Sequence, residues 1–405
     1  MKTVIIGMSA AGLSCLDTLL RVSPGADITV ISGEKYSPYC RCLLTYYLGG
    51  KMREEQMTIR DPSSLPPNVR LLSGENVTDI AAAKKTIILS SGKEINYDKL
   101  LISTGASAVK PEYLDEQKRV FTLRDIDDAR KIAPFIKEKA IVLGGGFVGL
   151  KTALGLLERK TRVGMIISSA YPLSMVLDEG TGRFIEKDLK EMGIEIRTNE
   201  DISGIGQNND SVRVSLKSGG ELETDLVVVG KGVTPRVGLA KKSGIRIDLG
   251  ITVNEFLETS AEDIYAAGDC CETMDIARKK PWINAVWPVA VEQGYFAGLN
   301  MAGIPSAYPG SIGVNSLKTH SFHLISGGIL KEKDGITIFE KHMPSTNQLR
   351  KLAVRDNVPV GMAFYNSPED AGVVINLIKR GMPLTVHPEE IVNREVSVMD
   401  ILKPL

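Results

Sequence analysis

The 405-residue sequence has few of the residues that build metal sites and disulfide frameworks. Its cysteines number five, and its four histidines all lie in the C-terminal quarter. No CxxC pair occurs, so the spacing typical of a zinc or iron–sulfur site is missing, and the sequence predicts no metal site. The odd cysteine number and the lack of scaffold spacing favour a reducing, cytoplasmic setting.

The sequence also lacks a net charge and a long apolar run. Lys plus Arg and Asp plus Glu both number 49, so no global field attracts nucleic acid, and a site for a charged partner must be a local patch. No uninterrupted apolar run of about 18 residues occurs, which predicts no membrane span. Gly7 and Gly12 interrupt the apolar N-terminal run, so we interpret it as a strand, a turn and a helix rather than a signal peptide.

The first glycine-rich turn follows a short apolar strand, Thr3–Ile6, and precedes an apolar helix that extends to about Val22. Backbone N–H groups at such a corner can bind a diphosphate at the helix N-terminus. The turn matches GxGxxG except that a serine replaces the middle glycine. The candidate dinucleotide-binding residues are Gly7, Ser9, Ala11 and Gly12, with Glu34 after the next strand as the candidate ribose ligand.

A second turn matches the same fingerprint in full. Residues 139–143 form a predicted strand, residues 144–149 read Gly-Gly-Gly-Phe-Val-Gly, and residues 162–167 form the next strand. The alternative is a plain strand-to-helix corner that needs glycine only for backbone freedom, but two such motifs in βαβ units favour nucleotide binding. The candidate residues are Gly144, Gly146, Phe147, Val148 and Gly149.

The second unit has no acidic residue where one usually binds the ribose hydroxyls. Ile167 occupies that position, followed by Ser168 and Ser169. The next arginine along the chain is Arg183, so no adjacent arginine is available for a 2′-phosphate. This pattern favours NADH without excluding NADPH.

Further motifs resemble, in order and spacing, the pyridine nucleotide–disulfide oxidoreductase family. They are Ser103–Ala106, Asp225–Pro235, Ile264–Asp269 and Gln293-Gly294. The branch most similar in appearance holds NADH:rubredoxin reductases, the flavin domain of nitrite reductases, NADH oxidases and coenzyme A disulfide reductases. The resemblance implies FAD and NAD(P)H as cofactors. It adds Thr104, Gly105, Gly268, Asp269 and Gln293 as FAD-binding residues and Gly232 as an NAD(P)-binding residue.

The resemblance also implies the architecture. We expect an α/β fold with two Rossmann-like dinucleotide-binding domains and a C-terminal α/β interface domain. Residues 1–108 and 236–308 would form the FAD domain, residues 109–235 the NAD(P) domain, and residues 309–405 a domain that usually makes a homodimer contact.

The segment of residues 36–47 resembles the start of the family helix that abuts the flavin. Arg41 would contact FAD phosphate or sugar oxygens, and Cys42 stands where some relatives carry a single redox cysteine. A nearby cation and a helix N-terminus would favour the thiolate. The alternatives are a packing role for Cys42 and a strained Cys40–Cys42 disulfide. Three departures from the family pattern favour packing. Ala10 stands where the peroxidase and oxidase members carry a histidine, Lys151 stands where many relatives have a glutamate, and Cys40 beside Cys42 is not the usual single-cysteine pattern.

The resemblance therefore implies an oxidoreductase that passes electrons from NADH through FAD to an acceptor. The first hypothesis is a small iron–sulfur or rubredoxin-like protein as acceptor, with Lys151 in the flavin environment. The second is Cys42-dependent reduction of coenzyme A disulfide or oxygen. The third is a flavin-bearing subunit of a larger redox complex. The acceptor, the direction of electron flow and the oligomeric state remain open at this stage.

Overall fold

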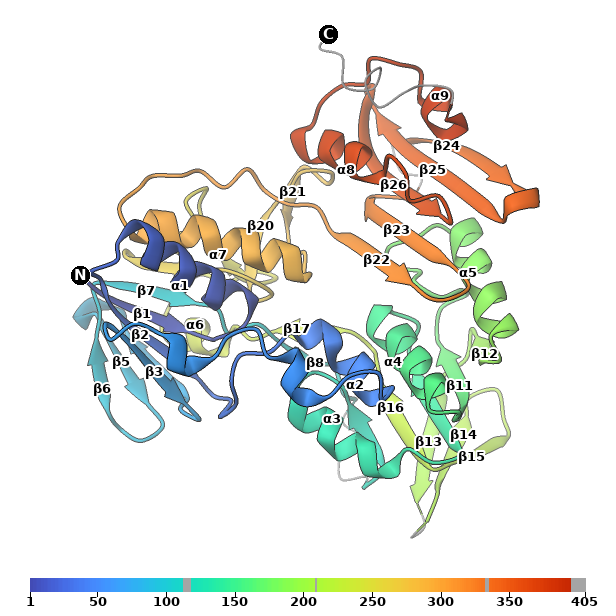
Figure 1. The fold of residues 1–405 in the computed structure, drawn as a ribbon, viewed down its shortest axis with the longest axis horizontal. Helices are drawn as coiled ribbons and strands as arrows, with labels where there is room; N and C mark the ends of the chain where they lie inside the picture. Colours follow the sequence, from blue (N-terminus) through green and yellow to red (C-terminus); the bar gives the residue numbers. More distant parts are fainter. Residues whose placement is uncertain (112–117, 208–209, 332–334, 395–405) are drawn as a thin grey trace. The chain divides into compact units, whose positions relative to one another are not determined.

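The computed structural model describes residues 1–111, 118–207, 210–331 and 335–394, which form a mixed α/β fold (Figure 1). The chain divides into two compact units, each assembled from three segments. The first unit contains Met1–Cys40, Met57–Ser107 and Thr234–Gly313. The second contains Arg41–Gln56, Ala108–Val233 and the described residues from Val314 onward. This division is coarser than the expected three domains, whose boundaries stay a prediction.

The first unit is built on a five-stranded parallel sheet with the order β19-β7-β1-β2-β3. Its strands are β1 (Lys2–Ile6), β2 (Asp27–Ser32), β3 (Val69–Ser73), β7 (Lys99–Ile102) and β19 (Ile264–Ala266). They are short and rich in β-branched residues, and the inner positions of β1 and β2 are buried, as expected for a parallel sheet covered on both faces.

Two helices, α1 (Ala10–Val22) and α7 (Trp287–Met301), lie side by side in this unit (Figure 1). Their close crossing requires Gly294, because a Cβ atom there would collide with the backbone carbonyl of Ala11. The buried faces of both helices share one hydrophobic core with β1 and β2, including Leu16, Leu19 and Met301. The turn before α1 is thus supported by a helix nearly 280 residues later in the chain.

Two small sheets complete the first unit. One is antiparallel, with β4 (Val77–Ala81), β5 (Thr86–Leu89) and β6 (Glu94–Asn96). The other joins β18 (Ile251–Thr252), β20 (Cys271–Asp275) and β21 (Lys280–Trp282), and β20 and β21 form an antiparallel hairpin. Helix α6 (Gly238–Lys242) also belongs to this unit, and strand β8 (Ala106–Ala108) pairs with strand β17 (Val233–Pro235).

The second unit contains its own five-stranded parallel sheet, with the order β12-β11-β10-β16-β9. The strands are β9 (Val120–Thr122), β10 (Lys139–Leu143), β11 (Arg162–Ile167), β12 (Glu195–Thr198) and β16 (Leu226–Val229). Its helices are α2 (Leu44–Leu48), α3 (Ile126–Ile132), α4 (Phe147–Glu158) and α5 (Glu179–Glu191). An antiparallel meander, β13 (Ile202–Gln207), β14 (Val212–Leu216) and β15 (Glu221–Thr224), adjoins it.

The C-terminal part of the second unit is an antiparallel sheet with the order β22-β23-β26-β25-β24. The strands are β22 (Val314–Lys318), β23 (His323–Gly328), β24 (Thr337–Met343), β25 (Gln348–Arg355) and β26 (Val358–Tyr365), with helices α8 (Ala371–Arg380) and α9 (Pro388–Asn393). Lys351 on β25 reaches Asp178, the N-cap of α5, at 2.7 Å, and Tyr365 donates to Asp188 on α5. The expected α/β class with two dinucleotide-type sheets is confirmed. The expected role of residues 309–405 as a dimer interface stays a prediction, and residues 395–405 lie outside the described residues.

Candidate functional site

The first glycine turn forms a tight corner between β1 and α1. Gly7 has φ +108°, and a Cβ atom there would collide with the carbonyl of Ser103, while one at Gly12 would collide with the carbonyl of Gly7. Ser9 is the N-cap of α1 in an extended conformation, and in the described part of the chain its side chain accepts no N–H of this helix. The turn therefore presents backbone N–H groups at a helix N-terminus, which fits a diphosphate.

Two other predicted FAD segments lie at the same edge of this sheet. Thr104 and Gly105 follow β7, and Gly268 and Asp269 follow β19, while both strands run parallel to β1 and lie in sequence with it across the sheet. Gly268 has φ +84°, and a Cβ atom there would lie 3.2 Å from the Cβ of Ala11. Asp269 is half-buried. The geometry thus brings three sequence-distant motifs to the carboxyl ends of adjacent strands, where open α/β sheets bind ligands.

Gln293 lies in the middle of α7 and is only 2% exposed. Its Oε1 accepts the backbone N–H of Gly268 at 2.7 Å, and its Nε2 donates to the hydroxyl of Thr273 at 3.1 Å. The amide group therefore holds the Gly268 turn in place. Direct contact of Gln293 with FAD stays a prediction, whereas the positioning role and the participation of Thr273 were not visible in the sequence.

Glu34, the candidate ribose ligand, lies just after β2. Its Oε2 accepts the hydroxyl of Tyr39 at 2.6 Å, and its backbone N–H donates to Ser32 Oγ at 3.2 Å. Tyr39 is buried, so the carboxylate is held at one oxygen by a rigid donor. Sequence reasoning identified Glu34 but missed Tyr39, because the pairing depends on how residues 34–39 turn.

Arg41 and Cys42 lie in a short 3-10 helix, Arg41–Leu43, that leads into α2. The Arg41 guanidinium donates to the carbonyl of Arg124 at 3.1 Å. Cys42 is exposed and Cys40 is half-buried, whereas Cys15, Cys270 and Cys271 are buried thiols whose pKa is raised by burial. Cys42 is therefore the most accessible sulfur of the five. The proposed roles of Arg41 at FAD and of Cys42 in redox chemistry stay predictions.

The second glycine turn repeats the geometry of the first. Gly144 has φ +115°, and a Cβ atom there would collide with the carbonyl of Gly230, while one at Gly149 would collide with the carbonyl of Gly144. Gly146 is the exposed N-cap of α4, followed by half-buried Phe147 and by Val148, which is 39% exposed. Gly232, with φ +96°, follows β16, the neighbour of β10. These residues form a second cradle that fits a diphosphate.

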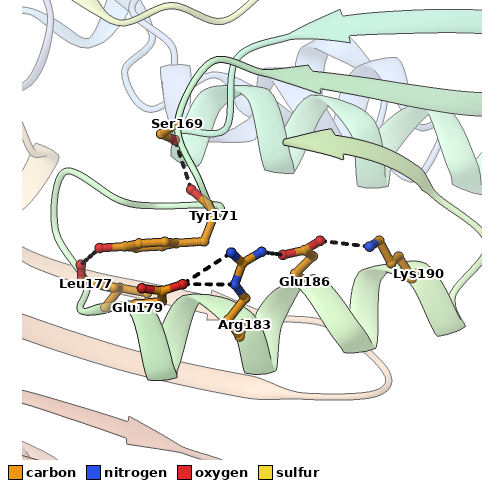
Figure 2. Close-up of polar contacts among 7 residues, drawn as sticks. All are labelled: Ser169, Tyr171, Leu177, Glu179, Arg183, Glu186 and Lys190. Atoms are coloured by element: carbon orange, nitrogen blue, oxygen red, sulfur yellow. Dashed lines mark hydrogen bonds and ion pairs between the residues drawn. The ribbon is translucent and has the colours of Figure 1, made fainter. Parts of the chain in front are cut away.

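The end of β11 shapes the ribose side of this second cradle. Ile167 packs on the turn, since a Cβ atom at Gly145 would lie 2.8 Å from its Cγ2. Figure 2 shows the following loop, in which Ser169 Oγ donates to the carbonyl of Tyr171 at 3.0 Å. The Tyr171 hydroxyl donates to the carbonyl of Leu177 at 3.3 Å. Ser168 is exposed, so a neutral hydroxyl stands next to the position of the usual acid.

Arg183 is held within helix α5. Its guanidinium contacts Glu179 at 3.2 Å and Glu186 at 2.8 Å, and Lys190 contacts Glu186 at 2.7 Å, as the row of side chains in Figure 2 shows. Burial alone would raise the pKa of Glu186, but the hydrogen bonds from Lys190 and Arg183 hold it below its ordinary value. Because Glu186 stays ionised, it retains Arg183 on α5.

Lys151 lies on the second turn of α4 and is half-buried. Helix α4 packs closely on α2, because a Cβ atom at Gly155 would lie 2.5 Å from the carbonyl of Thr45, and Lys51 pairs with Glu158 at 2.5 Å. The role of Lys151 in the flavin environment stays a prediction.

The described residues contain no group of three or more His, Cys, Asp or Glu side chains arranged to hold a metal ion. In the same part of the chain, no helix combines the length and apolar character needed to cross a membrane.

The sequence pattern of the family described as pyridine nucleotide-disulphide oxidoreductase matches residues 1–294. The NADH-rubredoxin oxidoreductase of Clostridium acetobutylicum is 32% identical over 89% of this chain and 92% of its own length. The assimilatory nitrate reductase electron transfer subunit of Bacillus subtilis is 26% identical over 98% of this chain and 51% of its own length.

Among solved structures, an NAD-dependent persulfide reductase from A. fulgidus is similar, with a TM-score of 0.88 and 30% identity over 95% of this chain and 77% of its own. The chain spans about half the length of the curated relatives that it matches over nearly its whole length.

Proposed function

Because this chain belongs to the pyridine nucleotide-disulphide oxidoreductase family, we propose that it oxidises NADH and passes the electrons through FAD to a small iron–sulfur or rubredoxin-like protein. One NADH is oxidised to NAD⁺ with release of one proton, and two oxidised carriers are each reduced by one electron. When bound, FAD supplies the chemistry that accepts a hydride and releases electrons singly.

The observation that carries the proposal is the presence of two separate glycine cradles. Each lies where a strand of a parallel sheet meets a helix, and in each a Cβ atom at the first or last glycine would collide with backbone. A single cradle would serve one nucleotide. Two cradles on two sheets support binding of two dinucleotides, and FAD and NAD(P)H are the cofactors of the family.

The residues of this chain bind and orient the cofactors. On the first sheet, Gly7, Ser9, Ala11 and Gly12 would receive the FAD diphosphate, Glu34 its ribose, and Asp269 the sugar chain beside the ring system. Gln293 fixes the Gly268 turn that carries Asp269. On the second sheet, Gly144–Gly149 would receive the NADH diphosphate. Groups that position a reactant lower the reaction barrier only when they are held rigidly. The hydrogen bonds of the Gln293 amide therefore help to keep the turn that carries Asp269 in the geometry that the reaction needs.

The acceptor is proposed from the relatives and from the sequence departures. The NADH-rubredoxin oxidoreductase of Clostridium acetobutylicum matches over 92% of its own length. Ala10 stands where the peroxidase and oxidase members of the family carry a histidine, and Lys151 stands where many relatives have a glutamate. Both points support a one-electron protein acceptor.

An anaerobic assay tests the proposal. The purified protein is expected to carry or take up FAD, to lose the yellow absorbance of FAD on addition of NADH, and then to reduce an added rubredoxin or ferredoxin with two carriers per NADH. A colourless protein that takes up no FAD would overturn the proposal at its first step. Reduction of FAD without reduction of any carrier would overturn the proposal that the acceptor is a small carrier protein.

A second candidate function is favoured by the exposure of Cys42. The NAD-dependent persulfide reductase from A. fulgidus is 30% identical to this chain, and an exposed thiol beside a helix could attack a disulfide. A Cys42→Ser variant separates the candidates. Under the first function it reduces rubredoxin as the parent does, whereas under the second the reduction of coenzyme A disulfide to two thiols is lost.

A third candidate is an electron-transfer subunit of a larger complex. It is supported by the nitrate reductase electron transfer subunit, of whose length this chain spans 51%. Affinity purification at native expression level tests it. Stable recovery of a second oxidoreductase with the chain, together with faster NADH oxidation in the complex, would favour this function over the first.

A further inference from the structure

We infer that residues 274–282, here termed the basic hairpin, are the docking surface for an acidic one-electron carrier protein. The basic hairpin comprises the end of β20, a turn and β21 (Figure 1). This inference rests on the proposed function and specifies where its acceptor binds. The chain has no net charge, so an acidic partner must be attracted by a local patch.

Three consecutive cations, Arg278, Lys279 and Lys280, form the tip of the basic hairpin. Lys279 and Lys280 are exposed, and among the described ion pairs neither lysine takes part in one. Met274 is 48% exposed and lies opposite the exposed Pro281 in the ladder. Residues opposite each other share a face of an antiparallel pair and neighbouring pairs alternate, so Met274 and Pro281 lie on one face of the hairpin, and Lys280 and Trp282 lie on the other.

The basic hairpin is rigid, which distinguishes it from a merely solvated turn. Asp275 is fully buried. Its carboxylate accepts hydrogen bonds from the backbone N–H of Arg278 at 2.7 Å, from the Arg278 guanidinium at 2.8 Å and from Asn284 Nδ2 at 2.9 Å. Arg278 and Lys280 also lie over the Trp282 ring, at 5.0 and 5.5 Å from its centroid. Burying a carboxylate is costly unless it is paired. Here the hydrogen bonds of Asp275 offset that cost, and they also fix the position of the positively charged Arg278 side chain.

The base of the basic hairpin is linked to the predicted flavin turn within the same unit. Thr273, on β20, accepts Gln293 Nε2, and Gln293 Oε1 accepts the N–H of Gly268. Trp282 lies opposite Thr273, and Lys280 lies opposite Asp275. Lys280 is thus two residues, or about 7 Å along the strand, beyond the level of Thr273, which is bonded to the Gln293 amide that holds the turn before Asp269. A carrier bound here would lie close to the turn that carries Asp269, the predicted ligand of the FAD sugar chain.

The partner that fits is a small protein with an acidic surface around its redox centre. Clustered cations held in fixed positions suit a transient complex, in which complementary charge guides the encounter. Nucleic acid is also polyanionic, and the test distinguishes its binding to the basic hairpin from binding of the proposed carrier protein.

The test uses a Lys279→Glu/Lys280→Glu variant of the full-length protein. The matched control, Lys84→Glu/Lys93→Glu, makes the same change in net charge at exposed lysines in the connections between β4, β5 and β6. Three acceptors are compared at low ionic strength: a rubredoxin, a [2Fe–2S] ferredoxin, and menadione, which is neutral. We expect at least a tenfold fall in kcat/KM for both proteins through KM, since steering of this kind changes association rates by about 10-fold or more.

The control variant should keep wild-type kinetics with all three acceptors, and menadione reduction should be unchanged in both variants. Added salt should slow wild-type carrier reduction but not that of the hairpin variant. A Lys279→Gln/Lys280→Gln variant, which is expected to lower kcat/KM about threefold, provides the same readout if charge reversal prevents folding. Carrier kinetics within twofold of wild type in these variants would overturn the docking inference alone, as would binding of duplex DNA without carrier binding. Wild-type protein that reduces menadione but no carrier would overturn the proposed function as well.

Discussion

Gly149→Ala separates the two nucleotide sites most directly. The added methyl group would lie about 1 Å inside the 3.4 Å limit of ordinary contact with the Gly144 carbonyl, which is backbone and cannot rotate away. Helix α4 must therefore shift relative to the turn by a distance of this order. A displacement of about 1 Å at a positioning group costs on the order of 100-fold in rate. We expect kcat/KM for NADH to fall by about that factor.

The assay combines steady-state NADH oxidation with menadione and measurement of FAD content by absorbance. Gly149→Ala is expected to keep full FAD content, whereas Gly12→Ala, which overlaps the Gly7 carbonyl, is expected to lose FAD. Gly164→Ala is the matched control, because its Cβ would lie 3.7 Å from Ile141 Cγ1, an ordinary contact. Loss of FAD from Gly149→Ala with normal NADH kinetics after reconstitution would refute the assignment of the second cradle.

Three further predictions follow from the site and its supports. Ser168→Arg should raise kcat/KM for NADPH at least tenfold, or about 1.4 kcal/mol, because an exposed cation would then adjoin the ribose position; unchanged NADPH kinetics would contradict this reading of the loop. Gln293→Ala should lower the free energy of urea unfolding by about 1–3 kcal/mol, because the buried Gly268 N–H and Thr273 hydroxyl lose their partner, and should weaken FAD binding; Thr273→Val, which removes one bond, should have the smaller effect. Lys351→Met should cost about 3–5 kcal/mol at pH 7, because Asp178 is left without its buried partner. Burial opposes both charges, but hydrogen bonding lowers the pKa of Asp178 and raises the pKa of Lys351. The stability difference between wild type and Lys351→Met should therefore disappear as pH falls below about 3.8 or rises above about 10.5. Urea unfolding measured across this pH range checks the pattern.

The sequence predicts the parallel sheets and their turns well because those features are local. The strand Lys139–Leu143 and the strand Arg162–Ile167 are found where the pattern indicates, and helix α4 begins at Phe147, within the glycine turn itself. Glycine is required at these corners by steric collisions within a few residues. A six-residue motif therefore contains enough information to place them.

The supports of the site could not be predicted in the same way. The bonds of Gln293 to Gly268 and Thr273 join residues 20 to 25 positions apart, and the pairing of Lys351 with Asp178 joins residues 173 apart. Nothing in the local pattern of apolar and polar residues marks these partners. They depend on the crossing of packed elements, which only the folded chain defines.

The crossing of α1 and α7 has a consequence for how the chain acquires its first cradle. The sheet of the second unit uses strands from residues 120–229, so all of its strands are synthesised before β19 and α7. The first cradle, although encoded within the opening dozen residues, gains the Gly268 turn that follows β19 and its backing helix α7 only once residues 264–301 have been made. Contacts this distant along the chain form late. We therefore expect flavin capture to follow completion of the second sheet during synthesis, and a nascent chain that stops short of α7 to release FAD readily.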